Sequence, residues 1–109
     1  MSSPTSRTMQ RLRAAGYLAA ITERWNPHAS IRQDLFGFID LVAIRSDKPG
    51  VLAIQCCALC DVSKRRHKIA SIAASSEWLA AGNRIEIWGW EKRAGKYMCK
   101  RVRIEKDES

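Results

Sequence analysis

The sequence predicts an α/β domain in which a mixed sheet is flanked by helices. Two nearly continuous apolar runs, 36–44 and 51–59, are typical of strands at the centre of a sheet, where both faces are covered. Apolar residues at helical spacing follow over 69–79, and two segments of alternating polarity, 84–88 and 97–105, come after them. The 109 residues are enough for one hydrophobic core, so we expect a single domain.

The N-terminal third predicts one short helix and one strand. A helix over 8–15 ends at Gly16, a residue type favoured just after a helix end. Residues 17–24 alternate loosely in polarity and are expected to form a strand, which ends before Pro27 because proline cannot donate to a strand ladder. Residues 28–33 are polar and are predicted to form a loop.

A second helix is expected after the strand over 51–59 and before the strand over 84–88. Asp61 or Ser63 would be its N-cap, and Gly82 would lie at its end. The complete element order is then αβββαββ, a mixed central sheet with helices packed on it. The inner face of the second helix carries Ile69, Ile72, Ala73, Ser76 and Leu79.

We expect the domain to cover residues 1–109, with frayed ends at 1–6 and 106–109. No apolar run approaches the roughly 20 residues that span a bilayer, and the N-terminus lacks the apolar core of a secretion signal. We therefore expect a cytoplasmic protein with no membrane association. In that compartment its four cysteines are expected to be reduced thiols.

The net charge of +8 predicts attraction to polyanions, with nucleic acid first; the alternative is a basic surface without such a partner. Cations cluster where the second helix begins, although the positive end of a helix dipole repels them. A phosphate bound to the free N–H groups there would offset this repulsion. A second basic strip is expected on the last strand. The predicted nucleic-acid-binding residues are Ser63, Lys64, Arg65, Arg66, Lys68, Arg101 and Arg103.

Asp40 is a carboxylate in an otherwise apolar run, and a charge there is costly unless it is compensated. Gln55 and Cys57 on the next run are two residues apart, so their side chains share a face. Mg²⁺ prefers oxygen ligands, which the Asp40 carboxylate, the Gln55 side-chain carbonyl and the Cys56 backbone carbonyl could provide. The alternatives are an ion pair of Asp40 with Arg24 or Arg32, and an amide of Gln55 that bonds to the backbone.

The segments 23–28, 32–40 and 53–55, together with the αβββαββ order, resemble the PD-(D/E)xK nuclease superfamily, which has the restriction-endonuclease-like fold. Holliday-junction resolvases and VRR-NUC proteins belong to it, and the same segments look like small phage and prophage proteins assigned to it. The resemblance covers roughly residues 7–104. The family places an aspartate on its second strand and Glu/Asp-x-Lys on its third.

In this chain the first motif matches Asp40, and the second matches Gln55 to Cys57, with glutamine in place of the acid and cysteine in place of the lysine. The resemblance implies hydrolysis of DNA phosphodiesters with Mg²⁺ or Mn²⁺. Lys64 or Lys68 on the following helix would then take the role of the lysine. A homodimer that reaches both DNA strands is also implied. The alternative is a decayed nuclease fold that acts as a DNA-binding module.

A second carboxylate would come from Glu23 or Asp34. The alternative for Glu23 is a solvated edge charge, and for Asp34 a role in shaping the loop before Gly37. A tryptophan can stack on nucleobases, but Trp88 and Trp90 are expected to pack in a core or a dimer contact, whereas both alternatives stay open for Trp25. The predicted metal ligands are Asp40, Gln55, Cys56 and Glu23, and the predicted catalytic residues are Asp40, Gln55 and Lys64.

Overall fold

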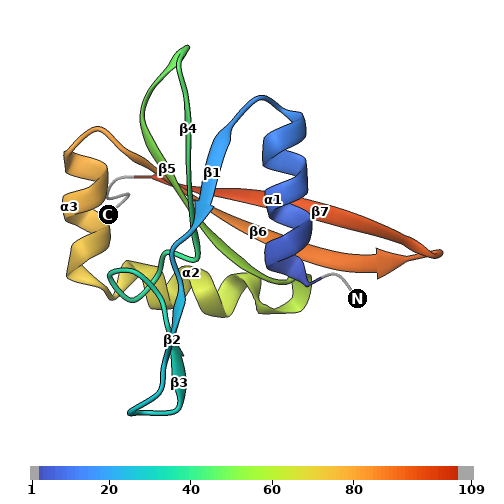
Figure 1. Cartoon of the computed structure of the whole chain (residues 1–109), viewed down its shortest axis with the longest axis horizontal. Coiled ribbons are helices and arrows are strands. Elements are labelled where there is room, and N and C mark those ends of the chain that lie inside the picture. Colours follow the sequence, from blue (N-terminus) through green and yellow to red (C-terminus); the bar gives the residue numbers. More distant parts are fainter. Residues whose placement is uncertain (1–2, 106–109) are drawn as a thin grey trace.

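Residues 3–105, which the computed structural model describes, form a five-stranded mixed sheet with helices on both of its faces (Figure 1). The spatial order is β1-β4-β5-β6-β7; β5 and β6 pair in parallel, and the other neighbours pair antiparallel. The mixed α/β class predicted from the sequence is therefore confirmed. The strands are β1 (Leu18–Ile21), β4 (Leu41–Arg45), β5 (Lys48–Ala58), β6 (Arg84–Arg93) and β7 (Lys96–Ile104).

The first helix, α1 (Pro4–Ala14), begins earlier than the apolar pattern predicts. Ser3 accepts a hydrogen bond from the backbone N–H of Ser6, and proline suits a first turn because its missing N–H would have no helical partner there. We expected residues 1–6 to be frayed, but the first turn of α1 is helical. The other terminal residues for which fraying is predicted, 1–2 and 106–109, lie outside the described residues.

The predicted second helix is interrupted and forms two helices, α2 (Val62–Ala70) and α3 (Ala73–Ala80). The chain is extended at Ile72 between them. The hydroxyl groups of Ser71 and Ser75 donate to nearby backbone carbonyls at this point, and such bonds compete with continuation of a helix. The prediction of one continuous helix was wrong because apolar spacing does not report these local bonds. No helix of the described residues is long and apolar enough to cross a membrane.

A separate two-stranded hairpin, β2 (Arg24–Asn26) and β3 (Ile31–Gln33), projects from the body of the domain (Figure 1). The strand expected over 17–24 is therefore shorter and ends at Ile21, the last residue of β1. Part of the loop expected over 28–33 forms the strand β3. The N–H groups of Thr22 and Glu23 donate to the carbonyl of Asp40 just before the chain enters this hairpin. The hairpin turn forms around the side chain of Asn26, whose oxygen accepts the next N–H groups.

The central strand, β5, sends alternate side chains into two cores. Leu52 and Ile54 pack with α1, while Cys57 packs on the side of α2. The predicted position of both apolar runs near the sheet centre is confirmed, since β4 and β5 are neighbours inside the sheet. However, β4 begins only at Leu41, so Asp40 immediately precedes the strand. The expected core role of Trp88 and Trp90 is also confirmed by their burial.

A glycine in β6 determines how closely α2 approaches the sheet. A short 3-10 turn, η1 (Leu59–Asp61), leads from β5 into α2. Asp61 occupies the N-cap position, one of the two residues expected there, although its side chain makes no capping hydrogen bond. A Cβ at Gly89 would collide with Val62 Cγ2 and lie 3.1 Å from Leu59 Cα. The start of α2 therefore needs a residue without a side chain below it.

We expect Gly89→Ala to lower the free energy of unfolding by about 1–3 kcal/mol, because the added methyl overpacks the contact with Val62. Urea denaturation of the single variants Gly89→Ala and Val62→Ala and of the double variant measures this. The double variant should lose less than the sum of the two singles, since removal of the valine methyls makes room. Strict additivity would show that this contact does not limit the approach of α2.

Candidate metal centre

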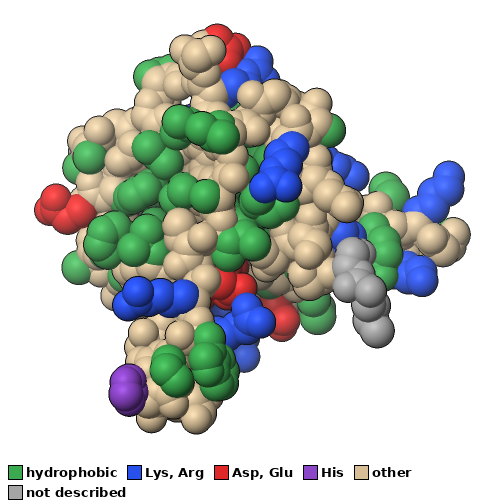
Figure 2. Space-filling view, viewed as in Figure 1, with side chains coloured by type: hydrophobic (Ala, Val, Ile, Leu, Met, Phe, Trp, Pro, Cys, Tyr) green, Lys and Arg blue, Asp and Glu red, His purple; other side chains and the backbone are tan. Residues whose placement is uncertain are grey.

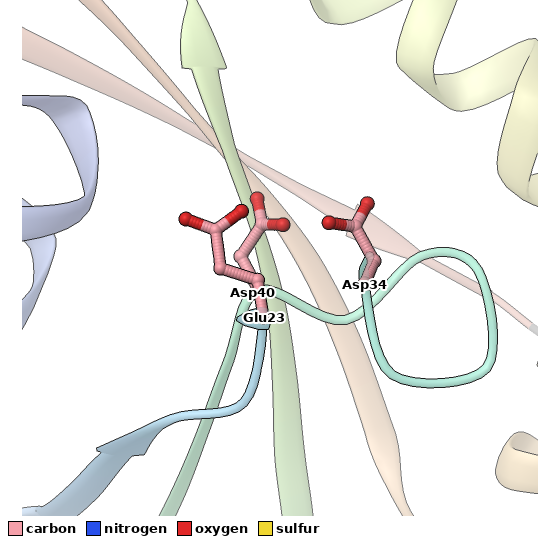
Figure 3. Close-up of side chains that lie close together, drawn as sticks. All are labelled: Glu23, Asp34 and Asp40. Atoms are coloured by element: carbon pink, nitrogen blue, oxygen red, sulfur yellow. The ribbon is translucent and has the colours of Figure 1, made fainter. Parts of the chain in front are cut away.

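Three carboxylates converge where the hairpin joins the sheet, namely Glu23, Asp34 and Asp40 (Figure 3). In this cluster of the described residues, one oxygen of each side chain lies within 4.8 Å of those of the others. Glu23 directly precedes β2, Asp34 directly follows β3, and Asp40 directly precedes β4. Residues from three separate segments thus meet at one point, which the pairing of the strands brings about. We call this group the acidic cluster.

Asp40 is the most firmly held member of the acidic cluster, with 4% of its surface exposed. Its Oδ2 accepts hydrogen bonds from the backbone N–H of Cys56, at 2.8 Å, and from Nε2 of Gln55, at 3.3 Å. Its carbonyl accepts from the N–H groups of Thr22 and Glu23. Because both the carboxylate and the backbone are tied to neighbouring segments, its oxygens are fixed at the end of the sheet.

Gln55 lies under the acidic cluster and has an unsatisfied oxygen. Its Nε2 is 3.3 Å from an oxygen of Asp34 and from an oxygen of Asp40, whereas its Oε1 is buried without a hydrogen-bond partner. A buried carbonyl without a partner is unfavourable. Exchange of the amide oxygen and nitrogen by a half rotation would direct the oxygen at the point where the carboxylates meet, which suits a cation bound there.

Burial raises the pKa of Asp40 from its usual 3.8 to about 7, and the hydrogen bond and charge of Asp34 and the charge of Glu23 act in the same direction. The hydrogen bond from the Cys56 N–H lowers the pKa and only partly offsets this increase. Carboxylates this close repel one another when they are ionised, and neither Arg32, which pairs with Glu23, nor Lys68, which pairs with Asp34, forms an ion pair with Asp40. The acidic cluster therefore favours either a proton or a metal ion, and a metal ion would be favoured as the pH rises.

Lys68 on α2 is the lysine that the fold brings to the acidic cluster. Its Nζ lies 3.6 Å from Oδ2 of Asp34. Lys64 is one helical turn earlier on the same side of α2 and is exposed. Burial raises the pKa of Cys57 to about 11, so its thiol is neutral at pH 7. The catalytic lysine predicted at position 64 is thus more distant along the helix than Lys68.

The structural alternatives for these residues are mostly excluded. Within the described chain neither Arg24 nor Arg32 forms an ion pair with Asp40, and Arg32 instead lies 3.3 Å from Glu23. The side chain of Glu23 is 16% exposed, so Glu23 is not a solvated edge charge. Gln55 donates to carboxylates and not to the backbone.

Asp34 has both of the roles considered for it. Its backbone carbonyl accepts the N–H of Gly37 and shapes the following turn, while its side chain joins the acidic cluster. The predicted metal ligands omit it, because nothing in the sequence separates Asp34 from other loop carboxylates. Cys56 anchors Asp40 through its N–H, and its carbonyl stays a predicted ligand.

A cleft of about 490 Å³ opens beside the acidic cluster. Figure 2 shows an acidic side chain where the hairpin joins the body, with basic side chains on both sides of it. A phosphate group could therefore approach the carboxylates with cations around it. The residues that line the cleft are Arg32, Gln33, Asp34, Gly37 and Lys68.

The predicted nucleic-acid-binding residues fall on two separate surfaces. Those of 63–68 lie on α2, which reaches the acidic cluster through Lys68. Arg101 and Arg103 lie on β7 and share the opposite face of the sheet with Trp88, whose ring lies 5.3 Å from the guanidinium carbon of Arg101. The second basic strip is therefore not part of the acidic cluster, and its binding role stays a prediction.

A scan against protein-family models finds no match to this chain, and searches of curated proteins and of solved structures find none either.

We expect Asp40→Asn to be more stable than the wild type at pH 7 and above in the absence of divalent metal. The pKa of Asp40 is higher in the folded protein than its usual 3.8, so the folded state binds more protons and the wild type loses stability as the pH rises from about 4 to about 7. The gain of the variant should therefore grow over that range and then level off. Its size is on the order of 1–3 kcal/mol, since one pKa unit corresponds to roughly 1.4 kcal/mol.

Urea denaturation in EDTA at pH 4 to 8 measures this difference. Asp47→Asn is the matched control, because Asp47 is an exposed carboxylate with a lowered pKa next to Arg45 and should give no such gain. A gain of Asp40→Asn that does not change with pH would contradict the raised pKa.

Proposed function

We propose that the protein binds nucleic acid and hydrolyses its phosphodiester bonds with Mg²⁺ or Mn²⁺ held by Glu23, Asp34 and Asp40. The observation that carries this proposal is the acidic cluster together with the buried, unpartnered oxygen of Gln55. In a purely structural cluster a buried amide oxygen would be expected to have a hydrogen-bond partner. The net charge of +8 supports a polyanionic substrate.

The ligand atoms at the acidic cluster fit a hard cation. Three carboxylates and one amide oxygen are the ligand types that Mg²⁺ and Mn²⁺ prefer. The thiols of Cys56 and Cys57 are neutral, because burial raises their pKa values to about 12 and about 11, and they do not add soft ligands at neutral pH. A bound cation would supply Lewis-acid stabilisation of a phosphoryl oxygen and lower the pKa of a bound water.

The protein's own groups would position the substrate. Lys68 and Arg32 both line the cleft and would balance the charge of the phosphodiester as it reacts. The Cys56 N–H holds Asp40 in one orientation, so its carboxylate needs little rearrangement when it binds a cation.

We also propose that the main sheet is a restriction-endonuclease-like core with the β2–β3 hairpin inserted after its first strand. In support, the elements around the hairpin follow the order α1, β1, β4, β5, then α2 and α3, then β6 and β7. A homodimer remains part of this proposal, because one acidic cluster addresses one strand of a duplex.

The second candidate function is DNA binding by a catalytically decayed nuclease fold. The neutral Cys57 at the position of the family lysine favours it. Such a module would bind DNA with the same dependence on salt and would not need metal.

We expect the purified protein to cleave labelled branched, duplex or single-stranded DNA with Mg²⁺ or Mn²⁺ and not with EDTA. Asp40→Ala should lower the cleavage rate by about 100-fold or more, since it removes a metal ligand, while binding in EDTA changes little. Gel assays of cleavage and fluorescence anisotropy of binding measure the two effects. Binding without cleavage by both proteins would support the decayed module, and no binding would reject both functions.

We expect Lys68→Ala to slow cleavage at saturating DNA by about 10- to 100-fold, because it removes the cation next to the acidic cluster. Lys64→Ala is the matched control, one helical turn away and more exposed, and should weaken DNA binding without a comparable effect on the saturated rate. Single-turnover cleavage at several DNA concentrations separates the two. Equal rate effects of both variants would contradict the assignment of Lys68.

A further inference from the structure

We propose that the β2–β3 hairpin is a nucleotide-binding arm, in which Trp25 stacks on an unpaired nucleobase and Arg32 binds the phosphate next to it. The preferred substrate would then be single-stranded or locally unpaired nucleic acid. This inference rests on the proposed function, because it concerns the substrate of the acidic cluster.

The hairpin contributes no residue to either hydrophobic core. Its strands pair with each other and form a sheet separate from the main one. Nine of its ten residues, 24–33, are exposed, and Asn26 is partly buried. An isolated two-stranded ribbon is only marginally stable in water. A function outside the core accounts for its presence better than packing does.

The hairpin begins and ends at the acidic cluster. Glu23 directly precedes its first strand and Asp34 directly follows its second strand, so the residues at both of its ends are members of this cluster (Figure 3). Whatever binds along the arm is therefore held next to these carboxylates.

The face of the hairpin that carries Trp25 also carries a cation. In the hairpin register Trp25 is directly opposite Arg32, so the two side chains share one face of the ribbon. Trp25 is 58% exposed, whereas Trp88 and Trp90 are buried. Arg32 reaches Glu23 at 3.3 Å and also lines the cleft that contains Asp34 and Lys68. An exposed aromatic ring, a cation and the acidic cluster thus follow one another along a single path.

The charge of the hairpin suits a phosphate at its base. Residues 24–33 contain Arg24 and Arg32, both near the acidic cluster, and no aspartate or glutamate. An aromatic platform next to cations is how proteins hold unpaired bases without reading sequence. In a uniform duplex the faces of the bases are already stacked on one another, so Trp25 could not reach them. The arm would hence distinguish unpaired from paired nucleic acid.

The test compares Trp25→Ala and Trp25→Phe with the wild type in EDTA, where cleavage is absent. Affinity is measured by anisotropy for a labelled single-stranded oligonucleotide and for a duplex of the same length. We expect Trp25→Ala to weaken single-strand binding by about 10-fold, Trp25→Phe to retain most of it, and duplex binding to change less than about 2-fold. Ile31→Ala is the matched control, because Ile31 is 50% exposed on the other face of the same ribbon and should have little effect.

A second readout reports stacking directly. The single-stranded oligonucleotide should quench the intrinsic tryptophan fluorescence of the wild type, and Trp25→Phe should bind with that quenching largely lost. Equal weakening of single-strand and duplex binding by Trp25→Ala, or an equal effect of Ile31→Ala, would overturn the arm. A change of oligomeric state of Trp25→Ala in light scattering without a loss of binding would also overturn it, by assigning Trp25 to a contact between two copies.

The outcome is separable from that of the proposed hydrolysis. Single-strand binding that depends on Trp25, in a protein that never cleaves, would leave the arm established and reject the metal-dependent activity. Metal-dependent cleavage that is insensitive to Trp25 would establish the activity and overturn the arm. Absence of binding to any oligonucleotide would overturn both.

Discussion

The hydrogen bond between the Asp40 carboxylate and the backbone N–H of Cys56 is the interaction on which this end of the molecule depends. It joins the start of β4 to β5 through a charged side chain that is almost completely buried. The carbonyl of the same residue accepts the N–H groups of Thr22 and Glu23, just before the hairpin begins. Asp40 thus contacts both β5 and the segment that leads into the hairpin.

Such an arrangement is unfavourable for stability unless something else compensates for it. Burial and neighbouring carboxylates raise the pKa of Asp40 to about 7, and the oxygen of Gln55 has no partner. A sequence selected for stability alone would replace these groups with apolar side chains of similar size. Their presence in one place is the main physical reason to regard the acidic cluster as functional.

The second constraint is the close approach of α2 to the sheet. Gly89 allows the start of α2 to lie directly on β6, and this placement brings Lys68 to Asp34. The positive charge next to Asp34 therefore comes from Lys68 on a helix, while Cys57 on β5 packs as a small neutral side chain in the core. The two features are consistent with each other, because the charge absent from the strand is present on the neighbouring helix.

The sequence by itself determined the α/β class, the central position of the two apolar runs and the nearness of Asp40 to Gln55. Strand alternation and the cost of a charge in an apolar run act locally, so they are visible in the order of residues. Helix continuity failed as a prediction, because the hydroxyl bonds of Ser71 and Ser75 are not part of the apolar pattern.

Only the tertiary structure decided which other residues join Asp40. Asp34 is six positions away from Asp40 along the chain, and the hairpin that ends at Asp34 begins just after Glu23. Without the pairing of β2 with β3, these carboxylates are ordinary loop residues. The choice between Lys64 and Lys68 likewise depends on how α2 lies on the sheet, which is determined by packing against Gly89 and not by any pattern within the helix. Local chemistry therefore identified the centre of the site, and contacts between distant segments determined its other members.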